Sequence, residues 1–244
     1  MEYAKANTTQ WGKRYSAMMM SIPVNADLLK ADNWTESNKL PYDSTYMDGH
    51  FGGWIEGNAV ITPDGKIIDL LRADNTEKDA RDKAAIVHIS EDGKTASFNP
   101  ATGFIDFPGG SKKFTIRYDS LSGLYWTIAN YIPEAYKIES RAASIRNTQA
   151  LCSSADLTNW TVHTVLLQHA DVEKHGFNYV DWVFDGKDIL FVSRTAYEDG
   201  VGGARNFHDA NFLTFHRVKN FRKLKKKKLE QFQNAEATQH TSSK

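Results

Sequence analysis

The stretch Asp64-Gly-Lys-Ile-Ile-Asp-Leu-Leu-Arg72 decides the fold, because the chain uses it twice. It returns as Asp185-Gly-Lys-Asp-Ile-Leu-Phe-Val-Ser-Arg194, again an Asp-Gly turn followed by an apolar strand that ends in Arg. A second echo, Asp-Leu followed by Asn-Trp-Thr, also occurs twice, as Ala26-Asp-Leu28 with Asn33-Trp-Thr35 and as Ala155-Asp-Leu157 with Asn159-Trp-Thr161. Both separations are roughly 120 to 130 residues, or two units of about 60, which is typical of one supersecondary unit used several times.

Each unit predicts a β-hairpin followed by a third strand. Apolar, β-branched and aromatic residues on both sides of a Gly-containing turn indicate two antiparallel strands. The expected hairpins pair 54–61 with 67–71, 114–118 with 124–129, and 179–183 with 189–193, and the expected third strands are 84–89, 148–153 and 211–217. Two third strands lead through turns, Glu91-Asp-Gly93 and Ala155-Asp-Leu157, toward a fourth strand.

Four-stranded antiparallel units in series predict an all-β fold of the β-propeller type. Strands at 16–24 and 34–40 are expected to be the third and fourth strands of an earlier blade, and the last blade is expected to end after its third strand. We therefore expect a partial propeller of about three and a half to four blades over residues 1–222. Residues 223–244 are Lys-rich and polar, which is typical of a solvated tail. The alternative is a β-sandwich, which has no reason to reuse these turns at matching places.

The composition excludes several classes of protein. The 244 residues are 41% hydrophobic, enough for a buried core, and 30 Lys and Arg balance 30 Asp and Glu. This balance predicts neither a nucleic-acid nor a membrane partner. No stretch approaches the ~18 apolar residues of a membrane span, and the first residues lack the apolar core of a signal peptide. Cys152 is the single cysteine and is expected in the core.

Polar residues gather where one edge of the repeated units is expected. The start of the first strand, the end of the second and the start of the third share an edge in an antiparallel unit. Long loops at 73–83, 131–145 and 195–208 are expected at this edge, and loops of this length in compact folds are often functional. The candidate catalytic residues there are Glu56, Tyr179, Asp181 and Asp209, and the candidate substrate-binding residues are Arg72, Lys113, Arg146, Asn147, Arg194 and His208.

Carboxylates, arginines and a phenol together suit carbohydrate chemistry. One carboxyl group protonates the leaving oxygen while another group attacks or activates water, and Arg binds a sugar carboxylate in a bidentate manner. Tyr179 fits a nucleophile if a neighbouring carboxylate takes its proton, because a free phenol has a pKa near ~10. Each of these charged residues equally fits a structural tie between blades. His208 and Asp209 fit an orienting pair, a loop clamp or metal ligands; without a His-x-x-x-His spacing, no metal and no cofactor is expected.

Several motifs resemble a known superfamily. They are Glu56-Gly-Asn58, Phe107-Pro-Gly-Gly-Ser-Lys-Lys-Phe-Thr-Ile116, Tyr179-Val-Asp-Trp182, Ser193-Arg-Thr195 and His208-Asp-Ala-Asn-Phe-Leu-Thr-Phe-His-Arg217. The stretch from Trp54 to Arg222 that contains them resembles bacterial β-propellers of the sialidase-like, BNR-repeat superfamily. Ser90-Glu-Asp-Gly-Lys-Thr95 resembles a shortened Asp-box turn of such blades, and Ser154-Ala-Asp-Leu-Thr-Asn-Trp160 is similar to a turn of five-bladed glycosidase propellers.

The resemblance implies an exo-acting glycoside hydrolase. In such enzymes arginines hold the sugar carboxylate, a Tyr/Glu pair supplies the nucleophile and an Asp is the acid/base, and full-length relatives are expected to be secreted or periplasmic. The chain departs from the pattern because it has no Phe/Tyr-Arg-Ile-Pro motif and fewer blades than a sialidase, which suggests N-terminal truncation and an inactive fragment. Two alternatives are a non-catalytic glycan-binding propeller, with Tyr125, Trp126, Tyr179 and Trp182 stacking on sugars, and a polysaccharide lyase, with His208 or Tyr179 as the base.

Overall fold

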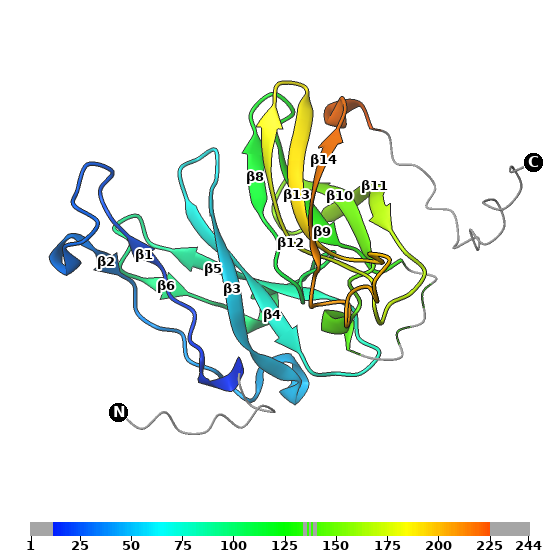
Figure 1. The fold of residues 1–244 in the computed structure, drawn as a ribbon. Coiled ribbons are helices and arrows are strands. Elements are labelled where there is room, and N and C mark those ends of the chain that lie inside the picture. The colour runs from blue at the N-terminus through cyan, green and yellow to red at the C-terminus, as the bar shows by residue number, and fades with distance from the viewer. Residues whose placement is uncertain (1–11, 134–135, 137, 139–140, 225–244) are drawn as a thin grey trace, which may run out of the picture.

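The computed structural model describes residues 12–133, 136, 138 and 141–224. It consists almost entirely of antiparallel sheets that follow one another in chain order (Figure 1). The first sheet pairs β1 (Met20–Ser21) with β2 (Thr35–Glu36), and the second contains β3 (Phe51–Ile61), β4 (Ile67–Asn75), β5 (Lys83–Ile89), β6 (Ala96–Ser97) and β7 (Phe104–Asp106). The third contains β8 (Ile116–Asp119), β9 (Leu124–Asn130), β10 (Thr148–Ser154) and β11 (Trp160–Gln168), and the fourth contains β12 (Gly176–Asp185), β13 (Asp188–Ala196) and β14 (Phe212–Val218).

Helical segments are short. They are the 3-10 turns η2 (Ala31–Asn33), η3 (Tyr46–Gly49), η4 (Ala142–Ser144) and η5 (Phe221–Lys223), and the α-helix α1 (Pro100–Gly103). Within the described ranges, no helix has the length and apolar character needed to cross a bilayer.

The sheets are blades of a partial β-propeller, as the sequence predicts. The first strands of successive blades lie against each other, because the Asn58 side chain of β3 accepts the N–H of Ile116 in β8. The next pair is joined by the Trp182 indole, which donates to the Thr115 carbonyl at 2.9 Å, and by the Thr115 hydroxyl, which donates to the Val180 carbonyl at 3.3 Å. The first strands of the second, third and fourth sheets therefore lie side by side, as the inner strands of propeller blades do.

Apolar clusters fill each interface between blades. Cluster one joins the second and third sheets, and includes Ile68, Leu70, Phe107, Ile116 and Tyr125. Cluster two joins the first and second sheets, and includes Ala17, Phe51, Trp54, Leu71 and Val87. Cluster three joins the third and fourth sheets, and includes Trp126, Leu151, Trp182, Phe191 and Phe221. Strands that are buried on both faces explain the continuous apolar runs in the sequence, and Cys152 belongs to this core.

The predicted hairpins are confirmed; the first and the last extend further than expected, and β8 begins two residues later than expected. Gly65 and Gly186 have φ of 83° and 61°, which a glycine adopts without the steric cost of a Cβ. Gly186 lies in a two-residue loop between β12 and β13, whereas Gly65 lies in the longer loop between β3 and β4. The predicted strands at 16–24 and 34–40 are shorter: β1, β2 and an isolated bridge between Ala17 and Leu40 are what forms. Residues 225–244 of the predicted tail lie outside the described residues, and the domain boundary at 222 stays a prediction.

The last blade ends after its third strand, again as expected. Its outer strand β14 pairs with β13 alone among the described strands, and it exposes Leu213 at 71% and Phe215 at 66%. Val183 on β12 is 51% exposed. The sheet therefore presents an apolar surface and an unpaired strand edge, which are features that favour association.

The Asp-Leu turn between β10 and β11 is held by one carboxylate. Asp156 Oδ1 accepts the N–H groups of Thr158 at 2.8 Å and Asn159 at 2.7 Å, as Asp residues commonly do in turns. The Trp160 indole donates to the Leu157 carbonyl at 2.9 Å. The turn is therefore closed both by the carboxylate and by the indole.

The earlier echo of this turn, between β1 and β2, has the same indole contact. The Trp34 indole donates to the Leu28 carbonyl at 3.1 Å, and Asp27 Oδ1 accepts the N–H of Leu29 at 3.0 Å. The two copies of the sequence echo therefore occupy the same turn, between the third and fourth strands of a blade.

The Asp-box-like turn between β5 and β6 lies at the equivalent position. Ser90 Oγ donates to Asp92 Oδ1 at 2.6 Å and accepts the N–H of Thr95 at 2.8 Å, and Asp92 Oδ1 also accepts the N–H of Lys94 at 3.1 Å. A Ser and an Asp thus close the turn despite its missing residue.

Replacement of Asp156 by Ala is expected to lower the free energy of unfolding by about 1–2 kcal/mol, because two backbone donors lose a charged acceptor. The measurement is urea denaturation followed by circular dichroism. Thr158→Ala is the matched control, since it keeps the Thr158 N–H, and is expected to be near neutral. Equal stability of the two variants would contradict the role given to the Asp156 carboxylate.

Candidate functional site

Seven of the ten predicted site residues form one connected group at the edge predicted from strand order. We call this group the tyrosine–arginine site: Glu56, Arg72, Arg146, Tyr179, Arg194, His208 and Asp209. The edge is built from the end of β4, the segment before β10, the start of β12 and the end of β13. It brings residues from three successive blades together.

Glu56 and Arg72 form an ion pair between adjacent strands. Arg72 Nη1 lies 3.0 Å from Glu56 Oε2, and the Arg72 side chain is 7% exposed while that of Glu56 is 36% exposed. The pairing of β3 with β4 shifts register between Trp54 and Gly57, at the point where Glu56 lies. Arg72 Nε is buried and makes no hydrogen bond to the described residues, so this guanidinium has a donor to spare.

Arg146 is buried and is oriented by two acceptors. Its Nε donates to the Ala143 carbonyl at 2.9 Å and its Nη1 donates to Asn178 Oδ1 at 3.0 Å. Burial, together with the nearby charge of Arg72, lowers the pKa of Arg146. Two guanidinium groups therefore lie close together in a poorly solvated region, which favours an anion beside them.

Tyr179 lies between two guanidinium groups. Arg194 is 5.0 Å and Arg146 is 5.9 Å from the centre of its ring, within the range of cation–π contacts. Tyr179 has a φ of 50°, and the pairing of β12 with β13 shifts register between Asn178 and Asp181. A bulge with a left-handed non-glycine residue is costly and redirects a side chain, and such residues concentrate at functional sites.

The Tyr179 hydroxyl contacts His208, and His208 contacts Asp209. Tyr179 Oη lies 3.2 Å from His208 Nε2, and His208 Nδ1 lies 3.4 Å from Asp209 Oδ1. Asp209 also accepts from Asn206 at 2.9 Å and from Arg205 at 2.6 Å. Hydrogen bonds from Asn206, His208 and Arg205 lower the pKa of Asp209, which keeps it ionised and makes it a hydrogen-bond acceptor for His208.

Other predicted residues have different surroundings. Asp181 is 62% exposed and pairs with Arg117 at 3.3 Å. Asn147 is buried and donates to the His169 carbonyl at 2.6 Å, so its amide holds a loop. Lys113 is half-buried, and no ion pair to it is found in the described part of the chain.

The aromatic platforms expected for sugar stacking are mostly buried. Tyr125, Trp126 and Trp182 are 3%, 2% and 2% exposed, because they fill the interfaces between blades. Tyr179 is the member of this set that stays partly accessible. Stacking on the three buried rings is therefore ruled out in this fold.

Sequence reasoning placed both Lys112 and Lys113 at this edge but chose Lys113, and it missed Asp82, the buried partner of Lys112. Lys112 is fully buried, and its Nζ lies 2.7 Å from Asp82 Oδ2 and donates to the Ala142 carbonyl at 3.1 Å. Burial lowers the pKa of Lys112, and Arg146 and Arg72 contribute to the shift. Lys112 lies in a turn before β8, where its N–H donates to the Gly109 carbonyl at 2.9 Å, so strand alternation does not identify it as buried.

The charged side chains around the site include more cations than carboxylates. Lys112, Arg72 and Arg146 are cations, whereas Glu56 and Asp82 are their carboxylate partners. Arg194 adds a further cation against the Tyr179 ring. The excess of positive charge favours an acidic ligand.

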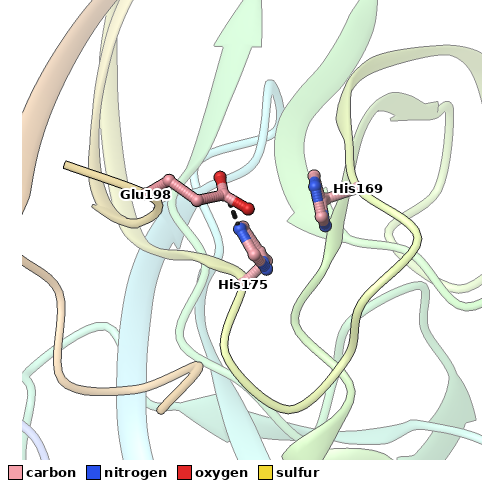
Figure 2. A group of neighbouring side chains, drawn as sticks. All are labelled: His169, His175 and Glu198. Atoms are coloured by element: carbon pink, nitrogen blue, oxygen red, sulfur yellow. Dashed lines mark ion pairs between the residues drawn. The ribbon is translucent and has the colours of Figure 1, made fainter. Parts of the chain in front are cut away.

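Away from this site, one group among the described residues has the composition of a metal site. It consists of His169, His175 and Glu198, whose ligand atoms all lie within 4.8 Å of one another (Figure 2). The sequence did not predict it, because the spacing matches no short metal motif.

Fold and site together define a partial β-propeller with an arginine-rich mouth. No protein-family model matches the chain, and no curated protein matches it either. Among solved structures, the chain is similar to an α-L-arabinanase of Penicillium chrysogenum complexed with arabinobiose, with 12% identity and a TM-score of 0.44 over 73% of this chain and 48% of that one.

Two further solved structures are similar to the chain. One is an α-L-arabinofuranosidase of Fusarium graminearum with an iminosugar inhibitor, with 10% identity and a TM-score of 0.46 over 86% of this chain and 51% of that one. The other is an exo-β-1,3-galactanase of Clostridium thermocellum, with 14% identity and a TM-score of 0.40 over 76% and 39%. The chain spans about half the length of these structures, or less.

Proposed function

We propose that the chain is part of a propeller-type glycoside hydrolase that acts on an anionic glycan, with sialidase-like use of a tyrosine. The observation that carries this proposal is the position of Tyr179, between Arg146 and Arg194 and with its hydroxyl on His208. The Tyr179 ring thus lies beside two guanidinium groups, and its hydroxyl has a histidine partner within hydrogen-bond distance, which is the arrangement of an activated nucleophile and its base.

In this proposal the arginines bind the acidic group of the sugar. Arg194 is the accessible guanidinium, since it is exposed on β13, while the unused Nε of Arg72 faces a buried setting. A carboxylate beside these groups gains charge-assisted hydrogen bonds in a region of reduced dielectric. The positive excess described above then selects acidic over neutral sugars.

The nucleophilic step would run through Tyr179. Its Oη forms a bond to the anomeric carbon as the glycosidic C–O bond breaks, and its proton passes to His208 Nε2. Asp209, which is held ionised, stabilises the resulting imidazolium through Nδ1. The leaving oxygen takes its proton from solvent, because Asp181, the acid expected from the sequence, is 62% exposed and paired with Arg117. Water then attacks the anomeric carbon of the glycosyl–tyrosine intermediate, its proton passes to the medium, and His208 returns a proton to Tyr179 Oη.

The same contact also favours a second candidate, a polysaccharide lyase. There Tyr179 or His208 removes the proton beside a uronate carboxylate, while Arg146 and Arg194 neutralise that carboxylate. Elimination leaves an unsaturated product that absorbs in the ultraviolet, whereas hydrolysis releases a saturated reducing sugar. The two products distinguish the candidates directly.

The test is a screen of the full chain on sialosides, on uronate-containing glycans and on neutral arabino-oligosaccharides, the last because arabinobiose is the ligand named in a similar structure. We expect binding or turnover of an acidic glycan and of no neutral one. Arg194→Ala is expected to lower kcat/KM, or the binding affinity where there is no turnover, by about 10- to 100-fold, the equivalent of one charged hydrogen bond. Tyr179→Phe is expected to remove turnover and leave binding.

Arg217→Ala is the matched control, because Arg217 pairs with Asp185 and Asp188 at the opposite end of the same blade. It is expected to keep wild-type kinetics. An unchanged Arg194→Ala variant removes Arg194 from the site. Binding without turnover supports the non-catalytic alternative, and the absence of both for every acidic glycan overturns the proposal.

A further inference from the structure

We infer that His169, His175 and Glu198 form a binding site for a divalent first-row transition metal, with Asp171 orienting one ligand. The site is independent of the proposed function, since it shares no residue with the tyrosine–arginine site. It lies where the segment after β11, the start of β12 and the segment after β13 meet (Figure 2).

His175 has the burial and the carboxylate partner expected of a metal ligand. It is 4% exposed, and its Nδ1 lies 3.0 Å from Asp171 Oδ2. When a carboxylate accepts a hydrogen bond from Nδ1–H, the lone pair of the neutral ring is on Nε2, which is the arrangement found around protein-bound zinc. Asp171 itself is fixed, because its Oδ1 accepts the N–H of Glu173 at 2.7 Å.

The contact between His175 and Glu198 points to a shared cation. Glu198 Oε2 lies 2.8 Å from His175 Nε2, so the buried ring stands between two carboxylates, Asp171 at Nδ1 and Glu198 at Nε2. When Nε2 carries no proton, a divalent ion can bridge Nε2 and the Glu198 carboxylate in its place. Tetrahedral zinc places its ligand atoms about 3.4 Å apart, so coordination requires Glu198 Oε2 to move outward and the two stacked imidazole rings to turn toward a common point.

His169 supplies the third ligand. Its ring stacks on His175 with centroids 3.5 Å apart, and Tyr197 packs edge-on against both rings, 5.3 Å from His169 and 4.9 Å from His175. The backbone of His169 is held by Asn147, whose amide donates to its carbonyl at 2.6 Å. His169 Nδ1 accepts the N–H of Asp171 at 3.1 Å, and coordination through this nitrogen would replace that bond.

The donor set selects the metal. Two imidazoles and one carboxylate suit zinc and its neighbours rather than calcium or magnesium, which prefer oxygen ligands. Three protein ligands leave a fourth position for water, and the Glu198 side chain, 63% exposed, opens this position to solvent.

The test is calorimetric titration of the full chain with Zn²⁺ at neutral pH, with Ca²⁺ as the comparison ion. We expect one saturable Zn²⁺ site and no comparable binding of Ca²⁺. Glu198→Gln is expected to weaken Zn²⁺ binding at least about tenfold, and Asp171→Asn about 10- to 100-fold, the effect typical of residues that orient a ligand. Because the Glu198 side chain is largely exposed, its variant should fold, which circular dichroism checks.

His88→Ala is the control, because His88 is exposed on β5 and lies in another blade. It should retain Zn²⁺ binding. Absorption spectra with Co²⁺ in place of Zn²⁺ should show the intense visible bands of a four-coordinate ion. Loss of binding in His88→Ala, equal affinity in Glu198→Gln and wild type, or the absence of saturable Zn²⁺ binding would each overturn the inference.

Discussion

Asp82→Asn is expected to lower the free energy of unfolding by about 3–5 kcal/mol, the loss typical when one partner of a buried ion pair is removed. The Asp82 carboxylate lies 2.7 and 2.8 Å from the Lys112 ammonium and also accepts the N–H groups of Gly109 at 3.1 Å and Ser111 at 3.2 Å. The variant leaves a fully buried ammonium beside a neutral amide. Burial already disfavours the charged form of Lys112, and the carboxylate of Asp82 is what offsets this cost.

The measurement is urea denaturation of Asp82→Asn, of Lys112→Met and of the double variant. We expect the double variant to be more stable than the sum of the single effects predicts, because it removes both charges together. Asp106→Asn is the matched control: Asp106 pairs with Lys83 at 2.6 Å but is 85% exposed, so its loss should cost less than about 1 kcal/mol. Equal effects of Asp82→Asn and Asp106→Asn would refute the assignment.

The same pair should influence the proposed site. Lys112 donates to the carbonyl of Ala142 and Arg146 donates to that of Ala143, so the two cations hold one short segment. Loss of the Lys112–Asp82 pair would therefore loosen Arg146 beside Tyr179. We expect any glycan affinity of Lys112→Met to fall at temperatures where the variant remains folded.

Asp69→Asn is expected to stabilise the protein at neutral pH by up to about 3 kcal/mol, which corresponds to the difference between two pKa values. Asp69 lies in β4, is 4% exposed, and burial raises its pKa from 3.8 to about 6, partly offset by the N–H of Asn58. Above pH 6 the folded protein carries a poorly solvated carboxylate. An Asn of the same shape carries no such charge.

The direction in which stability changes with pH follows from proton linkage at Asp69. The folded pKa is higher than the unfolded value, so the folded state binds the proton more tightly and stability rises as the pH falls from above about 6 toward about 4. The gain in the free energy of unfolding of Asp69→Asn over the wild type should therefore be largest at pH 8 and disappear near pH 4. Denaturation curves across this range measure it, with Asp32→Asn, an exposed residue in η2, as the control. A constant difference across the range would rule out the raised pKa as its cause.

Much of the fold could be predicted because its signals are local. The Asp-Gly turns, the apolar runs of the strands and the Asp-Leu/Trp turns depend on residues a few positions apart, and the blades built from them are confirmed. The shared edge also followed from strand order, which is why Arg72, Arg146, Tyr179 and Arg194 could be grouped. The short β1 and β2 were overestimated, since apolar residues there cover the second sheet without forming a long ladder.

The side chains that meet at the site could not be derived in the same way. Lys112 rather than Lys113 is the buried cation, and Asp181 pairs with Arg117 instead of joining the carboxylate of Glu56. A register shift of one residue moves a side chain to the other face of a sheet. The bulge at Tyr179 is such a shift, and no sequence motif near Tyr179 predicts it.

The sequence by itself determined the repeated four-strand unit, the turns and the edge that carries the arginines, because these depend on local backbone preferences and on the two-residue period of a strand. The tertiary structure decided which charges are buried, how Tyr179 is aimed between Arg146 and Arg194, and that His169, His175 and Glu198 converge. These contacts depend on the angle and register at which whole blades pack against each other. That packing results from many weak contacts between residues far apart in the chain.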